Sequence, residues 1–176
     1  MTRFRFAHVS WREWLGLCAA VLAAVSAFLN WTVLSGQTSA VVDALAGLPD
    51  ELTHRDAFSS GIYAWIPLGL IVLAGVTVVA VGQFRSVRVA GFPQLWLIVS
   101  GVALALAVIG LFAMRAQFGE QAGALLAETG VLASAGAGRW LGIAAAVVSA
   151  LAATIDVFAL RAEIPRRGRK TRRAAR

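Results

Sequence analysis

The sequence has few of the residues from which catalytic and metal sites are built. It contains one cysteine, Cys18, and two histidines, His8 and His54, among 176 residues. A single cysteine excludes an intramolecular disulfide and a zinc site made of cysteines. The chain has no Gly-rich phosphate loop, no Gly-x-Ser-x-Gly and no His-Glu-x-x-His. We therefore expect no enzyme activity, no metal and no cofactor.

Charge is also nearly missing from four long stretches, which together contain one charged side chain, Asp156. The stretches are Leu15–Leu34, Ile62–Gly82, Gln94–Met114 and Trp140–Leu160. Each has 20 or 21 residues, and a helix needs about 20 residues to cross about 30 Å of hydrocarbon. These stretches are apolar all round, whereas a helix of a water-soluble core is apolar on one stripe. The sequence therefore predicts an all-α integral membrane protein, with four transmembrane helices in a bundle within residues 1–160.

Basic residues are distributed unequally about these spans. Of the 16 arginines and lysines, 13 lie in the N-terminal segment, the loop 83–93 and the tail 161–176. Cytoplasmic loops are enriched in arginine and lysine. We therefore expect both termini to be cytoplasmic, in a multi-pass protein of the plasma membrane. All the basic residues but one are arginine, which together with the abundant alanine and glycine is typical of a GC-rich bacterial genome.

The first span has a second interpretation. Arginines, an apolar run and the small residues Val25-Ser26-Ala27 also fit a secretory signal peptide with its cleavage site. Cleavage would leave three spans in the same orientation, so the charge bias does not separate the two interpretations. We favour an uncleaved span, because the apolar stretch continues to Val33, past the usual ~7–15 residues of a signal core.

The two segments expected outside, 35–61 and 115–138, carry apolar residues at helical spacing with acidic residues off the stripe. This pattern predicts short amphipathic helices. A helix on a membrane surface usually has a basic polar face, so acidic faces favour packing over the bundle or binding a partner. Among the aromatic residues, Trp31 and Trp96 are expected at the headgroup level, where indole rings are enriched.

Two polar side chains within the spans are candidate sites. Asp156 is the one ionisable residue there, which makes it a functional hypothesis by default. It lies 16 residues after Trp140, roughly 24 Å along a helix, so we expect an interfacial carboxylate, with an ion-coupled role as the alternative. Its expected partners are Arg85, Arg88 or Arg161. Asn30, near the outer end of the first span, is expected to form an interhelical hydrogen bond.

Small residues recur at four-residue spacing along the fourth span. They are Gly138, Gly142, Ala146 and Ala150. Small faces let helices approach closely in lipid, where packing holds helices together. We expect this stripe to close the protein's own bundle, with an oligomeric interface as the alternative.

The C-terminal tail, residues 161–176, accounts for the net charge of +7 and is expected to be disordered. Its polybasic run is predicted to contact anionic lipid headgroups. The run consists of Arg166, Arg167, Arg169, Lys170, Arg172 and Arg173. The tail has no aromatic residue on which a base can stack, so nucleic acid is not an expected partner.

Together these features predict a non-catalytic accessory or scaffold subunit of a cell-envelope complex. It would act through helix–helix and outer-loop contacts with a membrane-protein partner or a second copy. The alternative is a small oligomeric transporter, channel or holin-like pore, with Asp156 and Asn30 as its polar positions.

Overall fold

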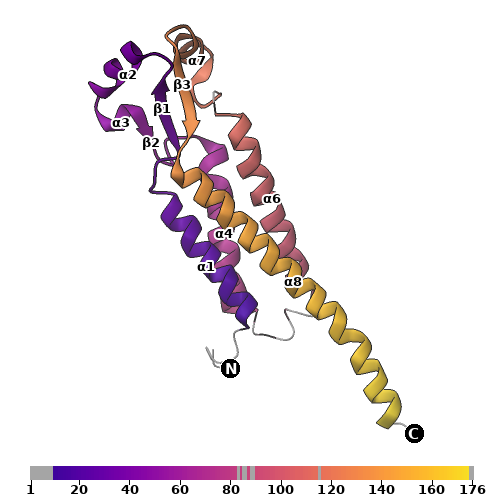
Figure 1. Cartoon of the computed structure of the whole chain (residues 1–176). Helices are drawn as coiled ribbons and strands as arrows, with labels where there is room; N and C mark the ends of the chain where they lie inside the picture. Colours follow the sequence, from indigo (N-terminus) through magenta and orange to yellow (C-terminus); the bar gives the residue numbers. More distant parts are fainter. Residues whose placement is uncertain (1–9, 83, 85–86, 88–89, 115, 175–176) are drawn as a thin grey trace.

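The computed structural model describes residues 10–82, 84, 87, 90–114 and 116–174, and from residue 163 onward it describes the backbone alone. The chain is mostly helical. Its four main helices are α1 (Trp11–Ser26), α4 (Ile62–Val81), α6 (Phe92–Phe112) and α8 (Ala137–Ala174). They form a bundle in which α1 packs against α4 and α8, and α6 packs against the same two helices (Figure 1).

Three of these helices are long and apolar enough to cross a membrane: α4, α6 and the Ala137–Ala162 part of α8. Their bounds agree closely with three of the four predicted spans. Many of their large apolar side chains point away from the bundle, as Leu73, Ile98 and Phe158 do with 65%, 62% and 62% of their surface exposed. Such a surface is far more apolar than water-soluble monomers tolerate, and it suits a lipid environment.

The predicted first span, Leu15–Leu34, has different bounds in the structure. Helix α1 covers Trp11–Ser26, and its 16 residues rise about 24 Å. The helix ends where the Trp31 indole Nε1 donates to the carbonyl of Ser26 at 2.6 Å, which satisfies an acceptor left over at the helix end. The β-branched residues Thr32 and Val33 then favour a strand. A fourth helix of membrane-spanning length is therefore not confirmed.

A three-stranded antiparallel sheet lies at one end of the bundle, and the sequence analysis did not predict it. Its order is β2 (His54–Arg55), β1 (Thr32–Gly36), β3 (Val131–Ala135). Strand β1 pairs with β3 from Thr32↔Ala135 to Gly36↔Val131. The sheet therefore joins the connection that follows α1 to the connection that precedes α8. We call this end of the bundle the sheet end, and the opposite end, where α1 begins, the tail end.

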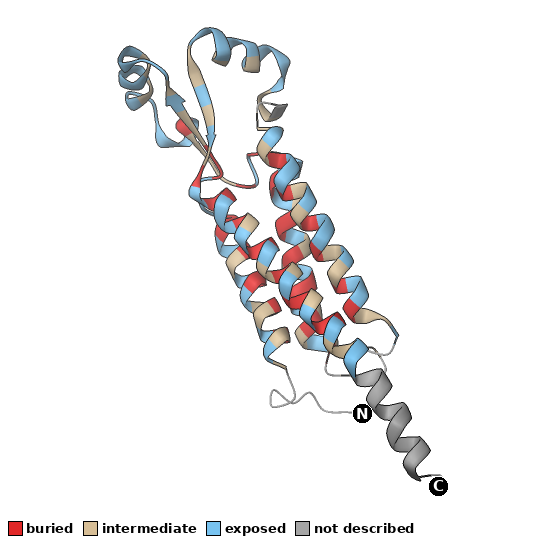
Figure 2. Cartoon of the chain, turned by 45° about the vertical axis from the view of Figure 1, so that its right-hand side comes forward, coloured by how far each residue is buried: buried red, intermediate tan, exposed pale blue. Residues whose placement is uncertain are grey.

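Short helices lie beyond the sheet, in the two segments where amphipathic helices were predicted. They are α2 (Ser39–Ala46), α3 (Asp50–Thr53), η2 (Ala116–Phe118) and α7 (Gly119–Glu128). Neither α2 nor α7 has a buried residue. Their contacts are mainly with the sheet and with η2, and both helices lie away from the bundle (Figures 1 and 2).

The bundle core is made of small side chains. Ala23, Ala103, Ala145 and Ala146 are fully buried where the helices meet, and Figure 2 shows buried positions along the inward faces of all four helices. Alanine allows short interhelical distances, which is how helices associate in lipid. The interior is therefore tightly packed.

Helix α8 continues beyond the bundle as far as Ala174. The segment predicted to be a disordered tail is thus helical from residue 161 to residue 174, and Pro165 does not end the helix. Arginine, lysine and alanine are good helix formers, so a helix already started in the bundle extends readily through a run of them.

Candidate functional site

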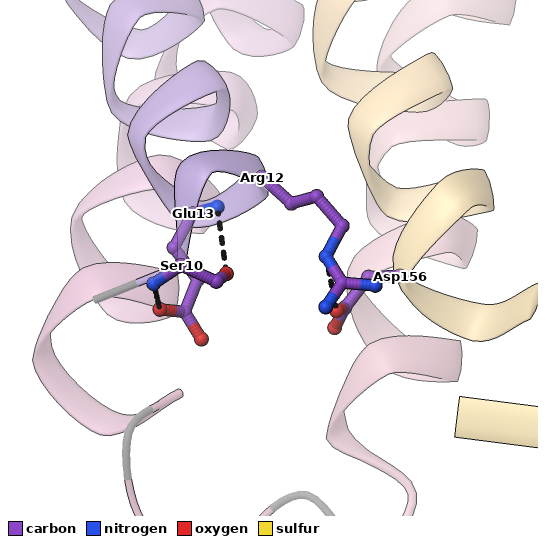
Figure 3. A network of polar contacts seen from close by, with 4 residues as sticks. All are labelled: Ser10, Arg12, Glu13 and Asp156. Atoms are coloured by element: carbon purple, nitrogen blue, oxygen red, sulfur yellow. Dashed lines mark hydrogen bonds and ion pairs between the residues drawn. The ribbon is translucent and has the colours of Figure 1, made fainter. Parts of the chain in front are cut away.

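The tail end holds a polar cluster at the start of α1 (Figure 3). Ser10 caps the helix: its backbone N–H donates to Glu13 Oε2 at 2.7 Å, and its Oγ accepts from the Glu13 N–H at 3.4 Å. This capping box satisfies two donors that the first turn would otherwise leave unpaired. Glu13 is 2% exposed, although its side chain is a carboxyl group.

Asp156 of α8 lies beside this cap and is paired with Arg12 of α1. The Arg12 Nε is 3.3 Å from Asp156 Oδ1, and both side chains are largely buried. The Nε–H makes no hydrogen bond, so the contact is an ion pair without the directional bond of a charge-assisted pair. The pair joins the first turn of α1 to α8.

The structure thus gives Asp156 a partner that the sequence analysis had not proposed. Of the three expected partners, Arg161 is exposed, and Arg85 and Arg88 lie outside the described residues. Arg12 lies in the first turn of α1, at the same end of the bundle as Asp156. Its place at the end of a predicted span could have identified it as a possible partner of Asp156.

A second polar cluster joins α6 and α8 in the middle of the bundle. The hydroxyls of Ser100 and Ser149 are 2.8 Å apart, and the Trp96 Nε1–H donates to Ser149 Oγ at 3.2 Å. All three residues are buried. The Trp96 ring is therefore part of the interhelical packing near the start of α6, and its level relative to the headgroups stays a prediction.

The small-residue stripe of α8 faces into the bundle. A Cβ at Gly142 would be 2.8 Å from Cζ2 of Trp31, and a Cβ at Gly138 would be 2.6 Å from Cδ1 of the same ring. Ala146 is fully buried, whereas Ala150 is partly exposed. Trp31, 1% exposed, is thus a core residue that lies against the two glycines and not an interfacial marker.

Asn30, the second predicted intramembrane polar residue, does not lie in a helix. It is exposed in the connection between α1 and β1, because α1 ends at Ser26. Its backbone carbonyl accepts from the Gly138 N–H at 2.9 Å. The interhelical role expected for its side chain therefore has no support from its position.

The sheet end holds a third polar cluster, centred on Arg139 in the first turn of α8. The guanidinium Nη1 donates to the carbonyl of Gly110, and Nη2 lies 3.4 Å from Thr32 Oγ1. Thr32 Oγ1 is also 3.2 Å from the Ser60 hydroxyl and accepts from Gln117 Nε2 at 3.1 Å. Arg139 is 3% exposed. Its burial was not predicted from the sequence, where Arg139 is one of the three basic residues on the side expected to be outside.

Acidic residues beyond the sheet do not form a metal site. No group of three or more His, Cys, Asp or Glu side chains suited to a metal ion occurs among the described residues. Asp56 accepts hydrogen bonds from the side chain and the backbone of Ser59, which lower the pKa of its carboxyl below the ordinary value. The Asp56 carboxylate therefore stabilises the local turn at residues 56–59.

The predicted lipid-contact residues Arg166, Arg167, Arg169, Lys170, Arg172 and Arg173 are on the final turns of α8. Their side chains lie outside the described part of the structure, so their contact with lipid stays a prediction.

No protein-family model matches the chain, and no curated protein or solved structure matches it either.

Proposed function

We propose that the chain spans the plasma membrane four times, with the tail end cytoplasmic and the sheet end outside. Support comes from α1, which packs along α4 and α8 and begins at the end where α8 leaves the bundle. The sheet end and its two connections carry three of the 16 basic residues, as the positive-inside rule requires of an outer side. The basic end of α8 would then meet anionic headgroups.

Single cysteines test this topology in a Cys18→Ala background. Trp11, Ser134 and Ala162 are each exposed in the structure. In intact cells a membrane-impermeant maleimide should label Ser134→Cys and leave Trp11→Cys and Ala162→Cys unlabelled until the membrane is opened. Labelling of Trp11→Cys together with Ser134→Cys would mean that α1 does not cross the membrane.

We propose that the protein is an accessory subunit which binds an envelope partner through the helices beyond its sheet. The observation that carries this proposal is the exposure of their apolar side chains. On α3 and α7, Leu52 and Leu125 are 58% and 60% exposed, and Val42, Leu48 and Leu132 are also exposed nearby. These residues form the apolar stripes seen in the sequence, and neither the bundle nor the sheet buries them.

An amphipathic helix normally buries its apolar stripe, and the alternative of packing over the bundle is not the arrangement found. Docking a partner would remove this surface from water, and exposed apolar patches mark interaction sites. Acidic residues flank the stripes, with Asp43 on α2 and Glu120 and Glu128 on α7. They favour a partner whose binding surface has a basic rim.

The test is purification of the full chain in mild detergent, with and without a charge in the stripe. Leu125→Asp should remove a stoichiometric membrane partner that copurifies with the native chain. Ala124→Asp, which places the same charge on the same helix but off the stripe, should retain it. Purification of the native chain as a lone species, or equal recovery with both variants, would refute the proposal.

The pore alternative has less support. The buried positions between the helices are filled mainly by alanine, with larger apolar side chains such as Ile71 and Val78 among them, and Asn30 lies at the surface of a connection. A pore would then have to form between copies. Ion flux in proteoliposomes that Asp156→Asn abolishes would favour it over the accessory role.

A further inference from the structure

Arg139 is a buried cation whose charge has no counter-ion in the described part of the chain. No carboxylate there lies within 4.0 Å of its guanidinium. Its hydrogen-bond partners, the Gly110 carbonyl and the Thr32 hydroxyl, are neutral, and its Nε has no partner. Trp31 offers a ring face 5.5 Å from the guanidinium carbon. A buried charge is costly unless it is paired, so this arrangement is suited to an anion.

A cavity of about 220 Å³ opens beside this guanidinium. It lies between the start of α4 and the end of α6, and Arg139 forms part of its wall. Its other polar lining residues are Ser60, Tyr63 and Gln117. The Ser60 hydroxyl and the Gln117 amide are donors that can turn toward a ligand.

The N-terminus of α4 forms another wall of the same cavity, because Gly61, Ile62, Tyr63 and Ala64 all line it. The N-cap is Gly61, and no side chain caps the helix. The first N–H groups of a helix lack intrahelical acceptors, and the aligned peptide dipoles make this end positive. Backbone donors and positive potential at a helix N-terminus bind anions. The guanidinium and the helix end therefore favour the same ligand.

The rim places this cavity at the lipid surface. Ile62 and Tyr63, the first residues of α4, are 55% and 48% exposed, and α6 ends at the same level. A tyrosine at a span end normally lies among the headgroups. The anions concentrated at that level are phosphates.

We propose that this cavity binds a phosphate group, through Arg139, the N-terminus of α4 and the hydroxyl and amide donors of Ser60 and Gln117. The phosphate belongs either to a phospholipid headgroup or to free inorganic phosphate. This site does not depend on the proposed partner, since the cavity and the stripes of α2, α3 and α7 share no residue.

The test uses the full chain purified in mild detergent. Inorganic phosphate binding is measured by equilibrium dialysis. Retained lipid is measured by native mass spectrometry after the detergent-solubilised chain has been incubated with phosphatidylglycerol or with diacylglycerol. Saturable dialysis binding identifies free phosphate as the ligand, whereas retention of phosphatidylglycerol without dialysis binding identifies the headgroup. The proposal is overturned if there is neither dialysis binding nor retention of phosphatidylglycerol, or if diacylglycerol and phosphatidylglycerol are retained equally without dialysis binding.

Three variants locate the site. Arg139→Gln should weaken binding about tenfold or more, the effect of losing one charge-assisted hydrogen bond. Ala113→Phe fills the cavity from the end of α6 and keeps every donor, so it should weaken binding similarly even if Arg139→Gln fails to fold. Arg55→Gln removes a charge from the same end, outside the cavity, where Arg55 stacks on Phe118. Its binding should stay within about twofold. Equal binding by Ala113→Phe and Arg55→Gln would overturn the assignment.

Discussion

Helix α4 packs tightly against α1 at Gly75. A Cβ added at Gly75 would be 2.6 Å from the Cβ of Ala20 and still closer to the carbonyl oxygen of Gly16. The second atom belongs to the backbone, so no side-chain rotation can relieve the contact. We therefore expect Gly75→Ala to push α1 away from α4. Gly69, on the same helix, has no atom within 4 Å of the corresponding position and serves as a matched control.

The magnitude follows from the geometry. Carbon atoms in contact are about 3.5–4.0 Å apart, so α1 must move by about 1 Å. Overpacking of this kind typically lowers the free energy of unfolding by about 1–3 kcal/mol. Replacing a helical glycine by alanine raises it by up to about 1 kcal/mol, because alanine has the higher helix propensity. This gain applies to both variants and cancels in their comparison. Gly75→Ala should therefore be about 1–3 kcal/mol less stable than Gly69→Ala.

Unfolding of each variant can be followed in mixed micelles by increasing the fraction of a denaturing detergent. The signal is tryptophan fluorescence, because Trp31 and Trp96 are buried and move into a polar environment on unfolding. A Gly75→Ala variant as stable as Gly69→Ala would refute the close contact of α1 and α4, and with it the packing of α1 as the fourth helix of the bundle.

Three further predictions concern polar contacts. Asp156→Asn should lower the free energy of unfolding by about 1–3 kcal/mol, a value between those of exposed and buried ion pairs. The loss should be smaller in an Arg12→Gln background; additive losses in a double-mutant cycle would contradict the pairing. Ser149→Ala should cost about 1–2 kcal/mol in the same unfolding assay, because its two partners lose their acceptor or donor. Thr154→Ala, whose hydroxyl donates within its own helix at 2.7 Å, should change stability by less than about 0.5 kcal/mol. The lowered pKa of Asp56 stabilises the fold above its unfolded pKa of about 3.9 and loses this effect as pH falls through the folded pKa. Asp56→Asn should therefore lower the unfolding temperature at neutral pH and match the native chain in strong acid; an equal difference at both pH values would contradict this.

The helical core of the fold was predictable from hydropathy, because a span of 20 residues with no charge has few alternatives. The bounds of α4 and α6 were predicted to within two residues at each end. The sheet was not predictable in this way. β1 follows directly on the apolar stretch of α1, so its residues were absorbed into a span, and its pairing with β3 depends on contacts that sequence periodicity does not contain.

The candidate sites were predicted in part. Asp156 was identified because a charge inside a span is rare, but its partner could not be deduced, since the choice between Arg12 and other arginines depends on which helix lies beside α8. Arg139 was missed for a related reason. It stands at the boundary of an apolar stretch, where arginine is usually solvated, and its burial follows from the folding of Trp31 and Thr32 over it.

The pairing of β1 with β3 has a consequence for the order in which the protein is made. Val33 and Ser134 face each other in the sheet and are 101 residues apart in the chain. During synthesis β1 is made long before its partner exists, and α4 and α6 are made in the interval. One edge of β1 therefore remains open until the residues just before α8 emerge. An unpaired strand edge can pair with another chain and lead to aggregation. The edge of β1 is therefore protected from aggregation only after β3 has been made and has paired with it.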